Sequence, residues 1–227
     1  MSIQIDSPIV SRAFVVLPIY DTYTTWRLYS SDNSWSGSVV SWTWTPAYSN
    51  GSYKLNTWVT ATSRAKIYQT FWWGGWSIWI NLFDRNPEFQ AFCVLSSDTT
   101  TNFTSFITFS GNTVSPTQDT STLVQKHMWF ILDGTVLFAS SWDGTTQVKT
   151  DISSGVTVTA LNAYRVTLRN NQILFYVNWI LKATHVSNIP TWSIWSASWM
   201  QCWIINDTWV TTSRDLYFWG WSISWDA

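Results

Sequence analysis

The sequence offers few residues for acid–base chemistry, because the 227-residue chain has a single glutamate, Glu88, beside twelve aspartates. Glycoside hydrolysis normally needs two carboxylates, one as acid and one as nucleophile or base. No expected strand carries two carboxylates in alternate positions, and Glu88 follows Pro87 in a segment typical of a solvated turn. We therefore expect no enzyme activity of this kind.

Nucleophilic catalysis and metal binding are equally poorly supported by the sequence. His127 begins one strand-like run and His185 ends another, and neither lies near a Gly-x-Ser-x-Gly motif. Both histidines are therefore interpreted as structural or surface residues. Cys93 and Cys202 each lie in an apolar run, so we expect buried free thiols; one disulfide is an alternative if their strands are adjacent.

We predict no cofactor, although calcium needs only loop carboxylates and carbonyls and stays an open alternative. The candidate ligands are Asp84 with Asn86, Asp143, and Asn206 with Asp207. Turn capping by Asp and Asn is the simpler interpretation of these residues.

Charge and hydropathy exclude two classes of partner. The net charge is −1 and only 11% of residues are charged, so no basic surface is available for a nucleic-acid backbone. No apolar run reaches the roughly 20 residues that span a bilayer, and the first residues lack the pattern of a secretory signal. We expect no nucleic-acid partner and no membrane span.

Strand-forming residues dominate the chain, since Ser and Thr alone supply 60 of its 227 residues. Short runs rich in Val, Ile, Thr, Tyr and Phe recur between Gly, Asn, Asp, Ser and Pro, which predicts a sandwich or barrel. No linker divides the chain, so we expect one domain over 1–227, with 1–35 as a lead-in segment. The expected strands are 13–19, 52–58, 64–71, 77–83, 89–95, 103–109, 127–133, 135–140, 146–151, 163–169, 172–178, 180–186, 198–205 and 214–225.

Tryptophan is unusually common, at 20 residues against 9 glycines. It often stands where the backbone favours glycine, most clearly at Asn178-Trp179 between two strand-like runs. A two-residue hairpin of this kind needs positive φ at both positions, so Asn-Gly is its usual sequence. The tryptophans could form sugar-stacking platforms or an aromatic core. We favour a third explanation, in which most of them are UGA codons that specify glycine.

The C-terminal half then resembles a known family. The succession His127-Met-Trp-Phe-Ile-Leu-Asp-Gly, Asp143-Gly-Thr-Thr-Gln, Leu161-Asn-Ala-Tyr-Arg-Val-Thr and Leu174-Phe-Tyr-Val-Asn-Trp-Ile-Leu-Lys-Ala-Thr-His185 is similar to the concanavalin A-like, laminin G-like jelly-roll superfamily. The resemblance is especially to the versions common in phage structural and bacterial surface proteins, and it covers about residues 125–225. The resemblance implies an all-β fold of two stacked antiparallel sheets.

The resemblance also sets the expected function. With one glutamate, the Glu-x-Asp-x-Glu strand of the glucanase branch cannot be present. We therefore expect a non-enzymatic module that binds carbohydrate or displays a surface on a phage virion or bacterial cell. The alternatives are a structural protein without a ligand and a diverged glycoside hydrolase. The expected partners are a glycan or other virion or surface proteins, with glycan contacts at Asp84, Arg85 and Asn86, because loops at sandwich edges often carry function.

Overall fold

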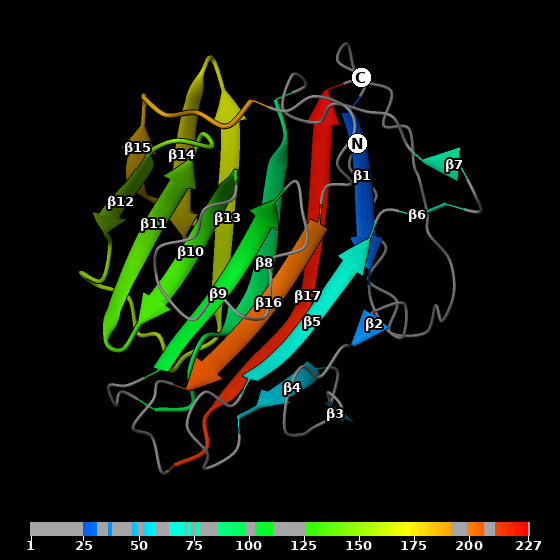
Figure 1. The fold of residues 1–227 in the computed structure, drawn as a ribbon, viewed down its shortest axis with the longest axis vertical. Helices are drawn as coiled ribbons and strands as arrows, with labels where there is room; N and C mark the ends of the chain where they lie inside the picture. The colour runs from blue at the N-terminus through cyan, green and yellow to red at the C-terminus, as the bar shows by residue number, and fades with distance from the viewer. Residues whose placement is uncertain are drawn as a thin grey trace.

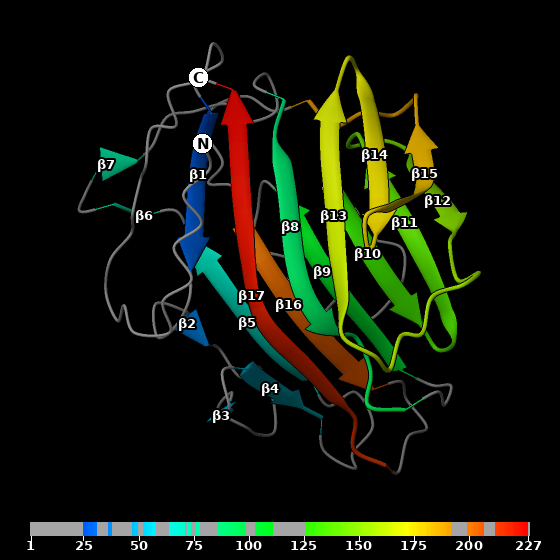
Figure 2. The ribbon, with the colours of Figure 1, turned by 180° about the vertical axis from the view of Figure 1, so that it is seen from behind.

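The computed structural model describes residues 25–30, 36–37, 47–49, 52–57, 64–70, 72–73, 76–77, 86–98, 103–110, 126–191, 199–206 and 212–226. Within these ranges the secondary structure is entirely β, with every strand pair antiparallel. Two large sheets are stacked face to face (Figures 1 and 2). The predicted all-β, two-sheet sandwich is therefore confirmed.

The eight-stranded sheet faces the viewer in Figure 2. Its order is β15-β14-β13-β8-β17-β4-β3, and β1 also pairs with β17. The strands are β15 (Ile180–His185), β14 (Gln172–Val177), β13 (Asn162–Arg169), β8 (Glu88–Val94), β17 (Asp215–Asp226), β4 (Ser52–Asn56), β3 (Ala47–Ser49) and β1 (Thr25–Ser30).

The seven-stranded sheet lies in front in Figure 1, with the order β12-β11-β10-β9-β16-β5-β2. Its strands are β12 (Gln147–Asp151), β11 (Val136–Trp142), β10 (His127–Asp133), β9 (Phe103–Ser110), β16 (Trp199–Asn206), β5 (Arg64–Thr70) and β2 (Ser36–Gly37). A small hairpin joins β6 (Trp72–Trp73) to β7 (Trp76–Ser77).

The core lies between the sheets and follows from the two-residue alternation of the strands. Tyr164, Val166 and Leu168 of β13 point inward, as the sequence predicts. Phe130 of the opposite sheet packs against Tyr164 and Phe175, with ring centroids 5.1 and 5.6 Å apart. Each such ring contributes about 1.5–3 kcal/mol when fully buried, so aromatic packing joins the sheets.

The hairpin between β14 and β15 has the predicted two-residue turn. Asn178 has a φ of 50° and Trp179 a φ of 69°, so both residues are in the left-handed region. Trp179 is 61% exposed, and its ring fills no core space. The local backbone therefore has the conformation that an Asn-Gly pair adopts without strain.

Several expectations need correction or fall outside the described residues. Glu88 is not in a solvated turn, because it begins β8 and is only partly exposed. Cys93 and Cys202 are buried and free, on strands of different sheets.

The expected strand 13–19 and most of 77–83 lie outside the described residues, and so does most of the lead-in segment 1–35. The single-domain boundary 1–227 stays a prediction.

Candidate functional site

The two outer faces of the sandwich differ in their accessibility. On the seven-stranded sheet, the side chains that alternate with the core form a second apolar cluster, and each is at most 1% exposed: Phe106, Trp129, Ile131, Trp203 and Ile205. A ligand cannot reach these residues in this structure. The outer face of the eight-stranded sheet is the more accessible of the two.

On β8, Glu88 and Phe92 alternate with the core residues Phe89, Ala91 and Cys93, so they belong to the outer face. The strand register aligns a row across this face in the order Leu181, Tyr176, Arg165, Gln90 and Ser222. We call Glu88, Gln90, Phe92, Arg165 and Tyr176 the open face, of which Gln90 is the buried member at 9% exposure.

An ion pair lies at the centre of the open face. Arg165 Nη2 donates to Glu88 Oε2 at 2.8 Å, and the two side chains are 26% and 20% exposed. Arg165 pairs directly with Gln90, and Glu88 with Thr167, so the ion pair joins diagonal neighbours on β13 and β8. The pair is accessible to a ligand while held between two strands.

Aromatic rings hold the guanidinium from the β14 side. The central carbon of the Arg165 guanidinium lies 4.9 Å from the centroid of the Tyr176 ring and 5.8 Å from that of the Trp179 ring. Phe92 is 38% exposed on the same face. Rings beside hydrogen-bonding side chains suit a ligand with both apolar and polar surface, as a sugar has.

The predicted glycan residues fall only partly within the described structure. Asn86 is exposed, has a φ of 48° and lies two residues before Glu88. Asp84 and Arg85 lie outside the described residues. The predicted loop therefore leads into the strand that carries the open-face carboxylate.

The calcium candidates have other local roles where they are described. Asp143 accepts hydrogen bonds from the backbone N–H groups of Thr145 and Thr146 at 2.7 and 2.8 Å, which lowers its pKa and caps the turn. Asn206 Oδ1 accepts a hydrogen bond from Thr57, and Asp207 is outside the described part. Within the described ranges, no group of three or more His, Cys, Asp or Glu side chains could hold a metal.

Both histidines are buried beside hydroxyl groups. His127 Nε2 lies 2.9 Å from Ser140 Oγ. His185 lies between Ser141 Oγ, 2.8 Å from Nδ1, and Thr150 Oγ1, 3.0 Å from Nε2. Burial lowers the pKa of His185 to about 4. These serine–histidine pairs are enclosed in the fold, so they cannot meet a substrate.

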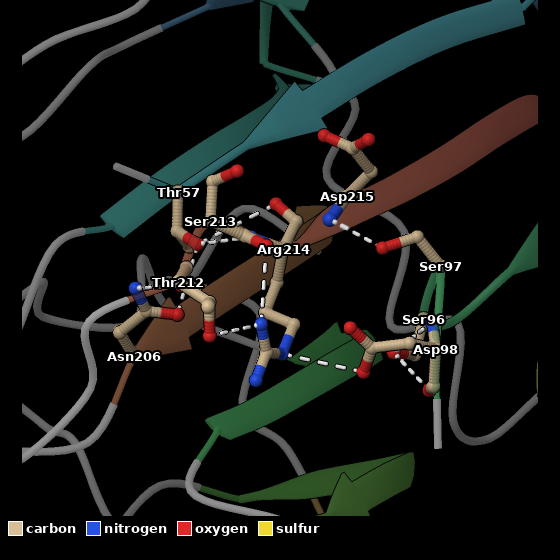
Figure 3. A network of polar contacts seen from close by, with 9 residues as sticks. All are labelled: Thr57, Ser96, Ser97, Asp98, Asn206, Thr212, Ser213, Arg214 and Asp215. Carbon is tan, nitrogen blue, oxygen red and sulfur yellow. Dashed lines mark hydrogen bonds and ion pairs between the residues drawn. The ribbon is translucent and has the colours of Figure 1, made fainter. Parts of the chain in front are cut away.

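A polar network at one end of the sandwich also has a structural role (Figure 3). Thr57 Oγ1 donates to Asn206 Oδ1 at 2.8 Å and accepts from the Arg214 backbone N–H at 2.8 Å. The Arg214 side chain is buried and forms an ion pair with Asp98 at 3.3 Å. The network connects the ends of β4, β8 and β16 to the start of β17.

Sequence reasoning missed Gln90, Phe92, Arg165 and Tyr176 as site residues. One signal was available, because the alternation in 163–169 predicts that Arg165 lies opposite the core residues. The partner of Arg165 comes from β8, 77 positions away in the chain. The pairing of β13 with β8, which brings them together, has no local sequence signature.

No protein-family model matches the chain, and no curated protein matches it in sequence. Solved structures do match. The Bacillus licheniformis β-glucanase is 14% identical with a TM-score of 0.57, covering 87% of this chain and 95% of that one. A β-1,3-1,4-glucanase (lichenase) from a mouse hindgut metagenome is 11% identical with a TM-score of 0.56, covering 88% and 98%.

The CBM2 module of the evolved Dit of Lactobacillus casei BL23 phage J-1 is 10% identical with a TM-score of 0.58, covering 90% of this chain and 97% of that one. The chain has a concanavalin A-like jelly-roll fold. The resemblance predicted from the C-terminal half is thus confirmed at the level of the fold.

The jelly-roll neighbours correct the functional expectation. A non-enzymatic binding or display module was expected, but the structural neighbours include glucanases, laminarinases and a transglycosylase. The prediction that the chain is not an enzyme is contradicted by this pattern. That prediction relied on the absence of a Glu-x-Asp-x-Glu strand, and it placed Glu88 in a turn instead of on a sheet face.

In the described part of the chain, no helix is long and apolar enough to cross a membrane.

Proposed function

We propose that this protein is a diverged glycoside hydrolase that acts on a polysaccharide bound across the open face. The observation that carries the proposal is the position of Glu88, the chain's only glutamate, which is partly exposed among aromatic and hydrogen-bonding side chains. The fold shared with β-glucanases supports the same class of substrate, a β-linked glucan.

The ion pair determines the role of Glu88. Arg165 donates a hydrogen bond to one carboxylate oxygen of Glu88, and this contact holds Glu88 as an acceptor, which suits a base or nucleophile better than a proton donor. Arg165 also restricts the orientation of the carboxylate, because its own guanidinium lies over the Tyr176 ring. In this proposal, Glu88 receives the proton of the attacking water or attacks the anomeric carbon itself.

The rest of the open face would bind the glycan. Phe92 and Tyr176 offer apolar ring surface on the same face as the ion pair, from strands β8 and β14. Gln90 pairs with Arg165 in the row that also contains Tyr176, and Asn86 lies two residues before β8 begins at Glu88. None of these contacts requires a tryptophan, so the proposal does not depend on how those codons are read.

The experiment is a reducing-sugar assay on β-1,3-1,4-glucan, laminarin and other polysaccharides, with Glu88→Gln and Asp133→Asn as variants. Asp133 ends β10 in the other sheet, which makes its variant a matched loss of one carboxylate. We expect wild-type activity on at least one β-glucan, an inactive Glu88→Gln variant, and an unchanged Asp133→Asn variant. Equal activity of Glu88→Gln and wild type would contradict the proposal.

We also propose that most tryptophan positions, beginning with Trp179, are UGA codons that specify glycine in the natural protein. The positive φ of Trp179, its exposure and its position in a two-residue hairpin support this. The test is the gene sequence at codon 179 together with the mass of the tryptic peptide from the natural source. A UGG codon, or tryptophan in that peptide, would contradict the proposal.

For its location, we propose association with a phage virion. The similarity in fold to a module of a phage Dit protein supports this setting. Mass spectrometry of purified particles from the source phage would test it. We expect the protein in the particle fraction; its presence only in the host-cell fraction would contradict the proposal.

A further inference from the structure

Thr167 lies on the outer face of the eight-stranded sheet, in the strand next to Glu88. On β13 it alternates with the core residues Val166 and Leu168, so it shares the outer face with Arg165. The strand register pairs Thr167 directly with Glu88. Side chains paired in this way have Cβ atoms about 4.5–5.5 Å apart, so the Thr167 hydroxyl is within reach of the Glu88 carboxylate.

The Thr167 hydroxyl is buried without a partner. The residue is 1% exposed, and its Oγ1 atom has no hydrogen-bond partner among the described residues. Arg165 Nε, on the same face of the same strand, is a second buried donor of this kind. Buried polar atoms nearly always have a partner, because an unmade hydrogen bond costs the full desolvation of the group. Two unpaired donors beside one carboxylate therefore need an explanation.

The Glu88 carboxylate has the complementary property. Its described hydrogen bond joins Oε2 to Arg165 Nη2 at 2.8 Å, and Oε1 has no described donor. The side chain is 20% exposed, so water reaches the carboxylate while the open face is empty. A glycan over this face would displace that water, and a carboxylate oxygen without water needs another donor. The Thr167 hydroxyl is a donor without an acceptor, one strand away.

We propose that Thr167 is a second positioning residue of the site, whose hydroxyl donates a hydrogen bond to Glu88 Oε1 when a glycan covers the open face. This inference rests on the proposed function. Arg165 then holds one oxygen of the carboxylate and Thr167 holds the other. A single hydrogen bond leaves the carboxylate free to rotate, whereas two bonds to different oxygens fix its plane towards the reacting sugar.

A hydroxyl that is retained for this purpose should cost stability. In the unliganded protein its hydrogen bond is unmade, so an apolar group of the same shape should be tolerated as well or better. Proteins keep such unfavourable groups where activity needs them. Thr167→Val preserves the shape of the side chain and removes the hydroxyl. We therefore expect this variant to be at least as stable as the wild type and less active.

The test measures melting temperatures and kcat/KM on β-1,3-1,4-glucan for Thr167→Val, Thr167→Ser and Ser105→Ala. We expect Thr167→Val to lose about 10–100-fold in kcat/KM, the size of a hydrogen bond to a charged group. Thr167→Ser should keep most of the activity, because it keeps the hydroxyl. Ser105→Ala is the matched control, since Ser105 Oγ is another buried hydroxyl without a partner among the described residues, on β9 of the other sheet. Its kcat/KM should equal that of the wild type.

The outcomes separate this inference from the proposed function. A fully active Thr167→Val variant beside an inactive Glu88→Gln variant overturns the inference and leaves the proposed function standing. A Thr167→Ser variant as impaired as Thr167→Val also overturns it, because the shape of the side chain would then matter and not the hydroxyl. A lower melting temperature of Thr167→Val would show that the hydroxyl already has a partner in the unliganded fold. A wild type inactive on every polysaccharide overturns both proposals.

A crystal structure with a β-glucan oligosaccharide on the open face gives a second readout that does not depend on rates. We expect Thr167 Oγ1 and Glu88 Oε1 to lie about 2.5–3.0 Å apart in that complex. A separation above about 3.5 Å with the oligosaccharide in place is not a hydrogen bond, and it would overturn the inference.

Discussion

Arg165 Nη2 and Glu88 Oε2 lie 2.8 Å apart on neighbouring strands of the eight-stranded sheet, and the two residues are diagonal neighbours. The arginine is stacked on Tyr176, so it has a fixed position from which to orient the carboxylate. In the proposed site we therefore expect Arg165 to be a positioning residue, whose loss changes the geometry of Glu88 more than the stability of the fold.

We predict that Arg165→Met lowers kcat/KM on a β-glucan by about 10²-fold, because small displacements of a catalytic group have effects of this size. The free energy of unfolding falls by less than about 1 kcal/mol, since the ion pair is partly exposed. Urea titration and initial rates measure the two effects.

Lys54→Met is the matched control for that variant. It removes the partner of Asp215 in the sheet's other described ion pair, at 3.0 Å and also partly exposed, far from Glu88. We expect a similar loss of stability and unchanged kcat/KM. Equal effects of the two variants on activity would contradict a positioning role for Arg165.

Trp179→Gly is expected to stabilise the protein. A non-glycine residue in the left-handed region costs about 1–2 kcal/mol, and Trp179 has a φ of 69° there. Loss of its exposed contact with the Arg165 guanidinium costs only about 0.5 kcal/mol. We expect a melting temperature about 2–4 °C higher. A lower melting temperature would show that the indole contributes more than the backbone strain costs.

Trp129→Gly should have the opposite effect, because Trp129 is fully buried beside Phe106, with ring centroids 5.8 Å apart. Removing a buried aromatic side chain costs about 3–5 kcal/mol. The two tryptophan variants together separate positions that need a small residue from positions that fill space. Calorimetry of both variants provides the comparison.

His185 gives the fold a defined acid sensitivity. Burial lowers its pKa from 6.5 to about 4, so the folded state favours the neutral ring. Its contribution to the free energy of unfolding is complete above pH 6.5 and is lost as the pH falls from 6.5 towards 4, by about 3 kcal/mol. His185→Gln should remove this dependence. Urea titrations at pH 7.0, 5.5 and 4.5 measure it, and an equal pH slope in the variant would contradict it.

The two thiols should be inert until the protein unfolds. Burial raises the pKa of both Cys93 and Cys202, and both side chains have no exposed surface. Thiolate is the reactive form, so we expect no reaction with a thiol reagent at pH 8 in the native state. Two thiols should react in denaturant. Fast labelling of the folded protein would show that the sheets open readily.

The sequence predicts much of the fold because strand periodicity is local information. The β10 range 127–133 agrees with the structure, and β13 and β14 differ from their predicted ranges by one residue. The hairpin at Asn178 is also predicted, since two-residue turns have specific φ requirements. These features depend on neighbouring residues in the chain.

The candidate site is less accessible to sequence reasoning, because it depends on which strands pair. Glu88 after Pro87 reads as a turn residue, and only the pairing of β8 with β13 places it beside Arg165. The same pairing of distant strands brings positions 88 and 224 together. No periodic pattern within β8, β13 or β17 encodes that neighbourhood.

The most direct test of the central claim is the rate at which wild type and Glu88→Gln release reducing ends from β-1,3-1,4-glucan. General acid–base and covalent roles of a carboxylate are worth about 10²–10⁴-fold. We predict that the wild type is active and that Glu88→Gln loses at least 100-fold with an unchanged melting temperature. A wild type without activity on this and the other polysaccharides, or a fully active Glu88→Gln variant, would contradict the proposal that Glu88 is the base or nucleophile of a glycoside hydrolase.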